Sequence, residues 1–107
     1  MNKEEALQQW LDEIGDVEYA YDFSGKKIKR SDFEVQNQVG WIISYIKPLK
    51  LGGPQDKSNS IIMHYRTAEE KGLHYPKFTI VDKAYTICHD QTDDFYYIER
   101  VINEDED

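Results

Sequence analysis

Residues 40–48 read Gly-Trp-Ile-Ile-Ser-Tyr-Ile-Lys-Pro, an apolar run that ends in lysine and proline. The apolar run 41–46 is rich in β-branched and aromatic residues, which predicts a short strand. Pro48 ends the run because proline has no N–H to donate to a β-ladder. The stretch is therefore predicted to be one strand with a defined end.

The residues that follow predict two further elements. Residues 47–59 contain Gly52-Gly53-Pro54 and many polar side chains, which is typical of a loop. Ile61-Ile62-Met63 predicts a second short strand, and residues 65–71 predict a short helix. The order strand, loop, strand, helix is that of a ββα unit.

Residues 3–14 predict an amphipathic helix. One apolar stripe, spaced at i, i+3, i+4 and i+7, runs along it: Leu7, Trp10, Leu11 and Ile14. Asn2 is positioned to cap its start with Glu5 three residues later, and Gly15 is placed to end it.

A hairpin is predicted after this helix. Val17, Tyr19, Tyr21 and Phe23 alternate with other residues, which predicts a strand that buries these four side chains. Ser24-Gly25 marks a turn. The basic stretch 26–30 then predicts either a return strand with a solvated face or a contact to phosphates.

The C-terminal part predicts more strands. Residues 78–81 and 84–88 flank a turn at Asp82-Lys83, which predicts a β-hairpin. Residues 95–98 and Val101-Ile102 predict a last strand.

The expected architecture is one α+β domain over residues 1–102. It comprises an N-terminal helix, short antiparallel strands, the central ββα unit and the C-terminal β-hairpin. Residues 103–107 are acidic and are predicted to be a disordered tail.

Composition limits the classes of protein to consider. The chain has 107 residues and a single cysteine, Cys88, which excludes an intrachain disulfide and favours a reducing, cytoplasmic setting. We expect no signal peptide and no membrane span. The net charge is −8, yet residues 23–88 hold eleven basic and six acidic residues. An acidic protein with a basic middle is compatible with either a protein partner or nucleic acid.

The spacing of residues 40–72 resembles the HNH endonuclease (ββα-metal) family. The matching positions need no gap: Gly40-Trp41, Ile46-Lys47-Pro48, Gly52-Gly53, Asn59, His64 with Tyr65, and Lys71-Gly72. The upstream stretch 21–33 also resembles what precedes the motif in many bacterial members, so the resemblance covers roughly residues 20–80.

The resemblance implies that the reactive positions have been replaced. The family's metal-binding Asp corresponds to Ser44, its general-base His to Tyr45, and its helix ligand to Ala68. The hydroxyl of Ser44 and the methyl group of Ala68 are poor metal ligands, and the phenol of Tyr45, which is protonated at pH 7, is a poor general base. Asn59 is retained as a residue that orients the motif, and a structural role is favoured for His64 over a catalytic one.

The predicted function is therefore that of a catalytically inactive, HNH-like binding or regulatory module, without a cofactor. A protein partner is slightly favoured because of the net charge, and nucleic acid is possible through residues 26–66. The predicted phosphate contacts are Lys26, Lys27, Lys29, Arg30, Lys47, Lys50 and Arg66.

Two alternatives stay open. A nuclease with a rearranged site would bind a divalent metal through Asp56, His64, Glu69 or Glu70. An acidic inhibitor or immunity-type protein would cover a basic partner.

Overall fold

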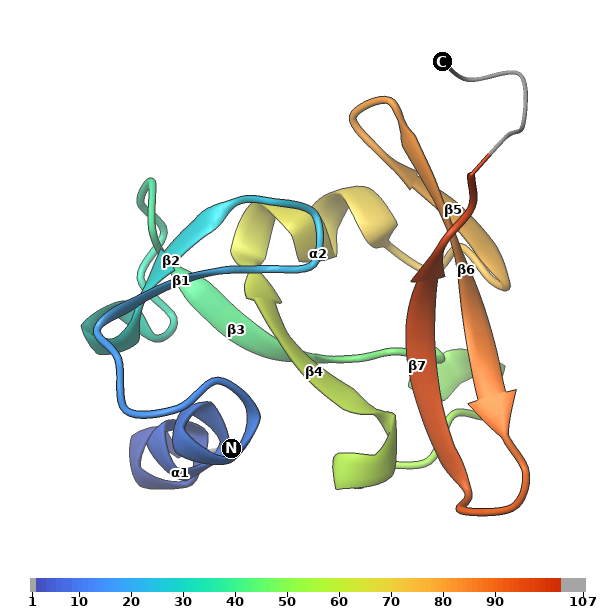
Figure 1. The fold of residues 1–107 in the computed structure, drawn as a ribbon, viewed down its shortest axis with the longest axis horizontal. Coiled ribbons are helices and arrows are strands. Elements are labelled where there is room, and N and C mark those ends of the chain that lie inside the picture. The colour runs from blue at the N-terminus through green and yellow to red at the C-terminus, as the bar shows by residue number, and fades with distance from the viewer. Residues whose placement is uncertain (1, 103–107) are drawn as a thin grey trace. The chain divides into compact units, whose positions relative to one another are not determined.

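The computed structural model describes residues 2–102, in which two α-helices are combined with seven short strands (Figure 1). The helices are α1 (Lys3–Glu13) and α2 (Tyr65–Lys71). The strands are β1 (Tyr19–Tyr21), β2 (Lys27–Lys29), β3 (Trp41–Tyr45), β4 (Ser60–His64), β5 (Lys77–Ile80), β6 (Lys83–Asp90) and β7 (Phe95–Arg100). They form the sheets β1-β2, β3-β4 and β5-β6-β7. The predicted α+β class is confirmed.

The described chain divides into two compact units. The first comprises residues 2–44 and 62–69, and the second comprises residues 45–61 and 70–102. The boundary runs through β3, β4 and α2, so the prediction of one domain over residues 1–102 stays a prediction. The predicted tail 103–107 lies outside the described residues. No helix within residues 2–102 is long and apolar enough to cross a membrane.

Helix α1 starts at a side-chain cap, as predicted. The Asn2 carboxamide oxygen accepts from the Glu5 backbone N–H at 2.8 Å, and its amide nitrogen donates to the Glu5 carboxylate at 3.2 Å. Gly15 follows the helix with a φ of 121°, in a region that glycine enters without strain. Local sequence therefore sets both ends of this helix.

Two tryptophans form the centre of the core in the first unit. The rings of Trp10 and Trp41 lie 5.0 Å apart and pack with Ala6, Ile28 and Ile62, all of them buried. Each indole N–H has a partner, Val17 O at 3.0 Å for Trp10 and Arg30 O at 3.2 Å for Trp41. The indoles therefore contribute large apolar area without leaving a buried donor unpaired.

The β1-β2 hairpin buries the face opposite to the one that the sequence predicts. Its antiparallel register pairs Tyr19 with Lys29, Ala20 with Ile28 and Tyr21 with Lys27. Ile28 is buried and Ala20 packs on the core, whereas Tyr19 is 48% exposed and Tyr21 67% exposed. The prediction that Val17, Tyr19 and Tyr21 are buried is wrong, because the core beside the tryptophans takes Ala20 and Ile28.

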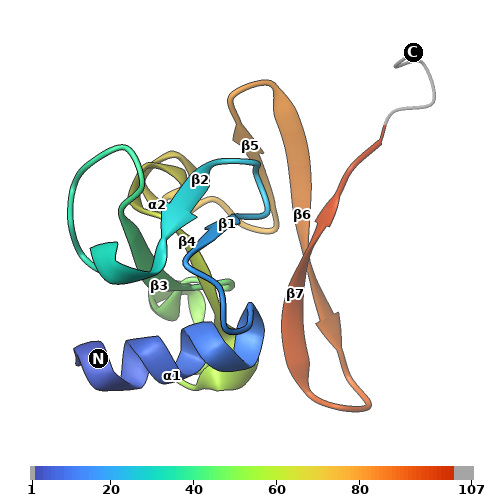
Figure 2. The ribbon, with the colours of Figure 1, turned by 60° about the vertical axis from the view of Figure 1, so that its left-hand side comes forward.

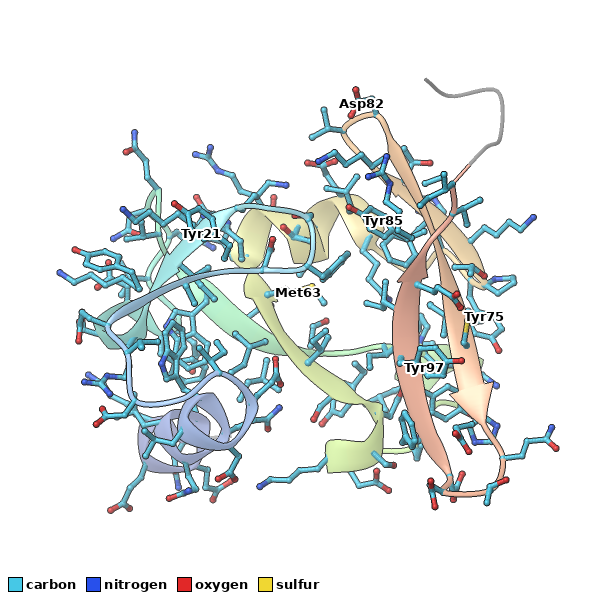
Figure 3. All side chains as sticks on the ribbon, viewed as in Figure 1. Tyr21, Met63, Tyr75, Asp82, Tyr85 and Tyr97 are labelled. Atoms are coloured by element: carbon cyan, nitrogen blue, oxygen red, sulfur yellow. The ribbon has the colours of Figure 1, made fainter. Side chains whose placement is uncertain are left out.

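The second unit contains a three-stranded antiparallel sheet, in which the predicted hairpin of β5 and β6 is extended by β7 (Figure 2). The last strand predicted at residues 95–98 is confirmed as β7, whereas Val101-Ile102 lie beyond its end. Phe78, Ile80, Tyr85 and Ile87 are its buried residues. The turn between β5 and β6 lies at Val81-Asp82, with Ile80 opposite Lys83, so the turn predicted at Asp82-Lys83 is one residue too late. Figure 3 shows Asp82 at the tip of this hairpin.

Val81 has a left-handed backbone, with φ of 59°, although it is β-branched and 77% exposed. That conformation costs an L-residue about 1–2 kcal/mol, and asparagine tolerates it best after glycine. We expect Val81→Asn to stabilise the protein by about 1 kcal/mol in urea unfolding. Val17→Asn, at an exposed valine outside the left-handed region, is the matched control and should not stabilise. Equal effects of the two changes would contradict the strain argument.

Candidate functional site

The motif positions fall within or directly beside the consecutive elements β3, β4 and α2. In the first unit Ser44 lies in β3, His64 is the last residue of β4, and Ala68 lies in α2. In the second unit Tyr45 ends β3 and Asn59 precedes β4. Ser44, Tyr45 and Ala68 are half-buried, whereas Asn59 and His64 are buried.

The imidazole of His64 is held on both nitrogens by the backbone. Nδ1 accepts the Arg66 N–H at 3.0 Å, so Nε2 must carry the ring proton, and it donates to Gln38 O at 2.9 Å. The ring also stacks on Tyr65 with centroids 4.9 Å apart. Neither nitrogen has a lone pair left for a metal ion or for a water proton.

The carboxylate of Asp22 connects the hairpin turn to the start of α2. Its Oδ1 accepts from Ser24 N, Ser24 Oγ and Lys26 N, at 2.7 to 3.0 Å. Its Oδ2 accepts from His64 N at 3.0 Å and from Thr67 Oγ1 at 2.6 Å. Burial raises the pKa of Asp22, but these hydrogen bonds outweigh it and leave the pKa below its usual value.

The side chain of Asn59 connects backbone segments of the second unit through three hydrogen bonds. Its Oδ1 accepts from Lys47 N at 2.8 Å, and its Nδ2 donates to Lys47 O and Pro54 O, both at 2.9 Å. A Cβ on Gly53 would lie 2.0 Å from Lys47 O, so this position requires glycine. Asn59 therefore closes the loop between β3 and β4 by replacing backbone partners.

Lys71, in the second unit, is a buried cation without a carboxylate partner among the described residues. Its side chain is fully buried, and its residue exposure is 2%. Its Nζ lies 3.4 Å from Tyr45 O and 5.4 Å from the Phe78 ring centre. Desolvation by burial lowers its pKa from 10.5 to about 8.

The seven basic residues predicted to contact phosphates differ in their surroundings. Lys27 and Lys29 lie on the exposed face of the β1-β2 hairpin, and the Lys26 backbone N–H binds Asp22. The Arg30 guanidinium is occupied by Asp16 at 2.9 Å and Glu18 at 3.4 Å.

Of the remaining three, Arg66 belongs to the first unit, and Lys47 and Lys50 belong to the second. Arg66 donates to its neighbour Tyr65 Oη at 3.1 Å. Lys47 lies 5.1 Å above the Tyr75 ring, in the second unit, and Lys50 is exposed. Figure 3 shows Tyr75 beside the C-terminal sheet of that unit.

The side chains at the motif positions do not fit the divalent metal that the resemblance implies. Ser44 offers a neutral hydroxyl and Ala68 no donor atom, while both nitrogens of His64 are engaged. Across residues 2–102, no three His, Cys, Asp or Glu side chains gather in a way that could hold a metal ion. We therefore derive no catalytic step through a metal at this place.

The chain was compared with protein-family models, with curated proteins and with solved structures, and none of them matches it.

Sequence reasoning missed Asp22, Thr67 and the burial of Lys71. For Asp22 a signal exists, because Asp22-Phe23-Ser24-Gly25 is a typical Asx-turn sequence. Nothing local marks Thr67 or Lys71, since their burial depends on residues distant in sequence.

We expect Asp22→Asn to lower the free energy of unfolding at pH 7 by about 2–3 kcal/mol, because a buried acceptor for five donors becomes an amide. Asp22 has a lowered folded pKa, so its stabilisation is present above its ordinary value of 3.8 and is lost as pH falls through the folded value. The deficit of the variant should thus shrink below pH 4 in urea unfolding. Exposed Asp82→Asn is the control, and a deficit independent of pH would contradict the role of the charge.

Lys71→Met should remove the pH dependence of the free energy of unfolding between about pH 8 and pH 10.5. The folded pKa of about 8 lies below the ordinary 10.5, so the unfolded chain binds more protons between these values and stability rises with pH there. The variant should be more stable than the parent below pH 8, and the gap should narrow towards pH 10.5. Exposed Lys83→Met provides the control, and parallel stability curves for Lys71→Met and the parent would refute the assignment.

Proposed function

We propose that this protein is a catalytically inactive, HNH-like domain that acts as a binding or regulatory module. In this proposal β3, β4 and α2 form the ββα unit. They follow one another along the chain in the order strand, strand, helix that such a unit requires. The positions needed for metal binding and water activation are Ser44, Tyr45 and Ala68.

The observation that carries the proposal is the hydrogen bonding of His64. A histidine that serves as ligand or general base needs one free nitrogen lone pair. Here Nδ1 is used by Arg66 N and the Nε2 proton by Gln38 O, within a buried residue. His64 thus acts as a brace between the end of β4 and residue 38, and it does not replace the missing base.

The residues retained from the motif stabilise the fold. Asn59 and Gly53 close the loop before β4, and Trp41 fills the core of the first unit. These contacts keep a folded framework whether or not a metal binds. A framework that is kept while its reactive side chains are replaced supports a role in binding.

The proposal is tested by restoring the reactive residues. We expect the combined change Ser44→Asp, Tyr45→His and Ala68→Asn to give a protein that Mn²⁺ or Mg²⁺ stabilises against heat, because a ligand that binds only the folded state must raise its stability. The parent chain should show no such shift. A triple variant that folds by circular dichroism and yet gains no metal-dependent shift would contradict the HNH-like framework.

The loss of hydrolysis is tested separately. Supercoiled plasmid incubated with the parent protein and Mg²⁺ or Mn²⁺ should stay intact. Metal-dependent nicking that a substitution at Asp56, His64, Glu69 or Glu70 abolishes would instead establish the rearranged nuclease. Two of these carboxylates already have backbone partners, Ser58 N for Asp56 at 2.9 Å and Val81 N for Glu70 at 2.8 Å.

A further inference from the structure

The outer face of the β1-β2 hairpin displays aromatic and basic side chains together. Residues directly opposite in an antiparallel pair share a face, so Tyr19 with Lys29 and Tyr21 with Lys27 lie on the side away from Ala20 and Ile28. Both tyrosines are large and exposed, whereas the core-facing residue between them is an alanine. We call these four residues, Tyr19, Tyr21, Lys27 and Lys29, the hairpin face.

We propose that the hairpin face binds single-stranded nucleic acid, with bases stacking on the tyrosines and the lysines contacting phosphates. Single-stranded nucleic acid would then be the partner in the binding role proposed above, and this inference rests on that role. It does not depend on whether the protein can hydrolyse nucleic acid.

The geometry of the tyrosines favours a single strand over a duplex. Tyr19 and Tyr21 are two residues apart on one face of a strand, which places them about 6.8 Å apart. Bases in a duplex strand rise by about 3.4 Å per step, so successive stacked bases cannot each meet one ring. An extended single strand can spread its bases to that spacing, and stacking on exposed aromatic rings is how such strands are bound.

The charges on the hairpin face are positioned for a backbone that passes over the rings. Lys27 Nζ lies 4.6 Å and Lys29 Nζ 5.7 Å from the Tyr19 ring centre. Both ammonium groups lie over the Tyr19 ring, so a base that stacks on this ring would take their place and release them to contact its phosphate. Neither lysine has a carboxylate partner at ion-pair distance within residues 2–102.

Arg30 neutralises one of the two nearby acidic charges, so a net charge of −1 remains on the Asp16, Glu18 and Arg30 group. Asp16 and Glu18 are held by the Arg30 guanidinium at 2.9 and 3.4 Å. Arg30 is thereby withdrawn from the set of phosphate contacts, which leaves Lys26, Lys27 and Lys29 on the hairpin, and Lys29 also interacts with the charge of Asp32. The protein's net charge of −8 disfavours general affinity for duplex DNA, so the contact relies on stacking.

The experiment measures the fluorescence anisotropy of labelled single-stranded oligonucleotides of about 12 residues, at low salt, with the matching duplex beside them. We expect the single strand to bind more tightly than the duplex. Tyr21→Ala should weaken binding by roughly 5- to 100-fold, whereas Tyr21→Phe should retain it, because the ring and not the hydroxyl does the stacking. Lys27→Ala should reduce the magnitude of the salt slope by about 0.7.

Matched controls come from the second unit. Tyr97→Ala removes from β7 a tyrosine that is 41% exposed, against 67% for Tyr21, and Lys83→Ala removes an exposed lysine from β6; neither should change the affinity. All variants change exposed or half-exposed side chains, and circular dichroism checks their folding. Absence of binding, tighter binding of the duplex, or equal losses at Tyr21 and Tyr97 would overturn the inference. Plasmid nicking by the parent protein would overturn only the proposed loss of hydrolysis.

Discussion

The buried carboxylate of Asp22 is the interaction on which the first unit depends. Five donors converge on its two oxygens, three from the turn after β1 and two from the junction of β4 with α2. A buried anion costs free energy unless hydrogen bonds replace its water, and here both oxygens are supplied. The fold must therefore bring residue 22 and residues 64–67 together, although more than forty residues separate them.

The carboxylate of Asp22 also fixes the backbone of His64. Its backbone N–H is bound by Asp22, and its ring is bound by Gln38 O and by Arg66 N. With backbone and side chain both fixed, the residue connects three segments of the first unit. Asn59 does similar work in the second unit by binding Lys47 and Pro54. Polar residues that look reactive in the sequence are thus used as structural hydrogen-bond partners.

The β1-β2 hairpin shows how the same chain can hold a framework and still present a binding surface. Its inner face gives Ala20 and Ile28 to the tryptophan core, and its outer face carries Tyr19, Tyr21, Lys27 and Lys29. Alternation along a strand lets one short element serve both purposes. In the proposed function, binding is located on the hairpin while the ββα segment maintains the fold.

Local sequence determined the elements whose energetics are local. Asn2 and Gly15 delimit α1, Pro48 and the glycines define the loop after β3, and the strand-loop-strand-helix order is readable between Trp41 and Lys71. Tertiary structure alone decided which face of β1 is buried, because alternation gives two equivalent faces and only the shape of the core around Trp10 and Trp41 chooses between them. It also decided that Asp22 and Lys71 are buried, since burial depends on residues brought together from distant parts of the chain.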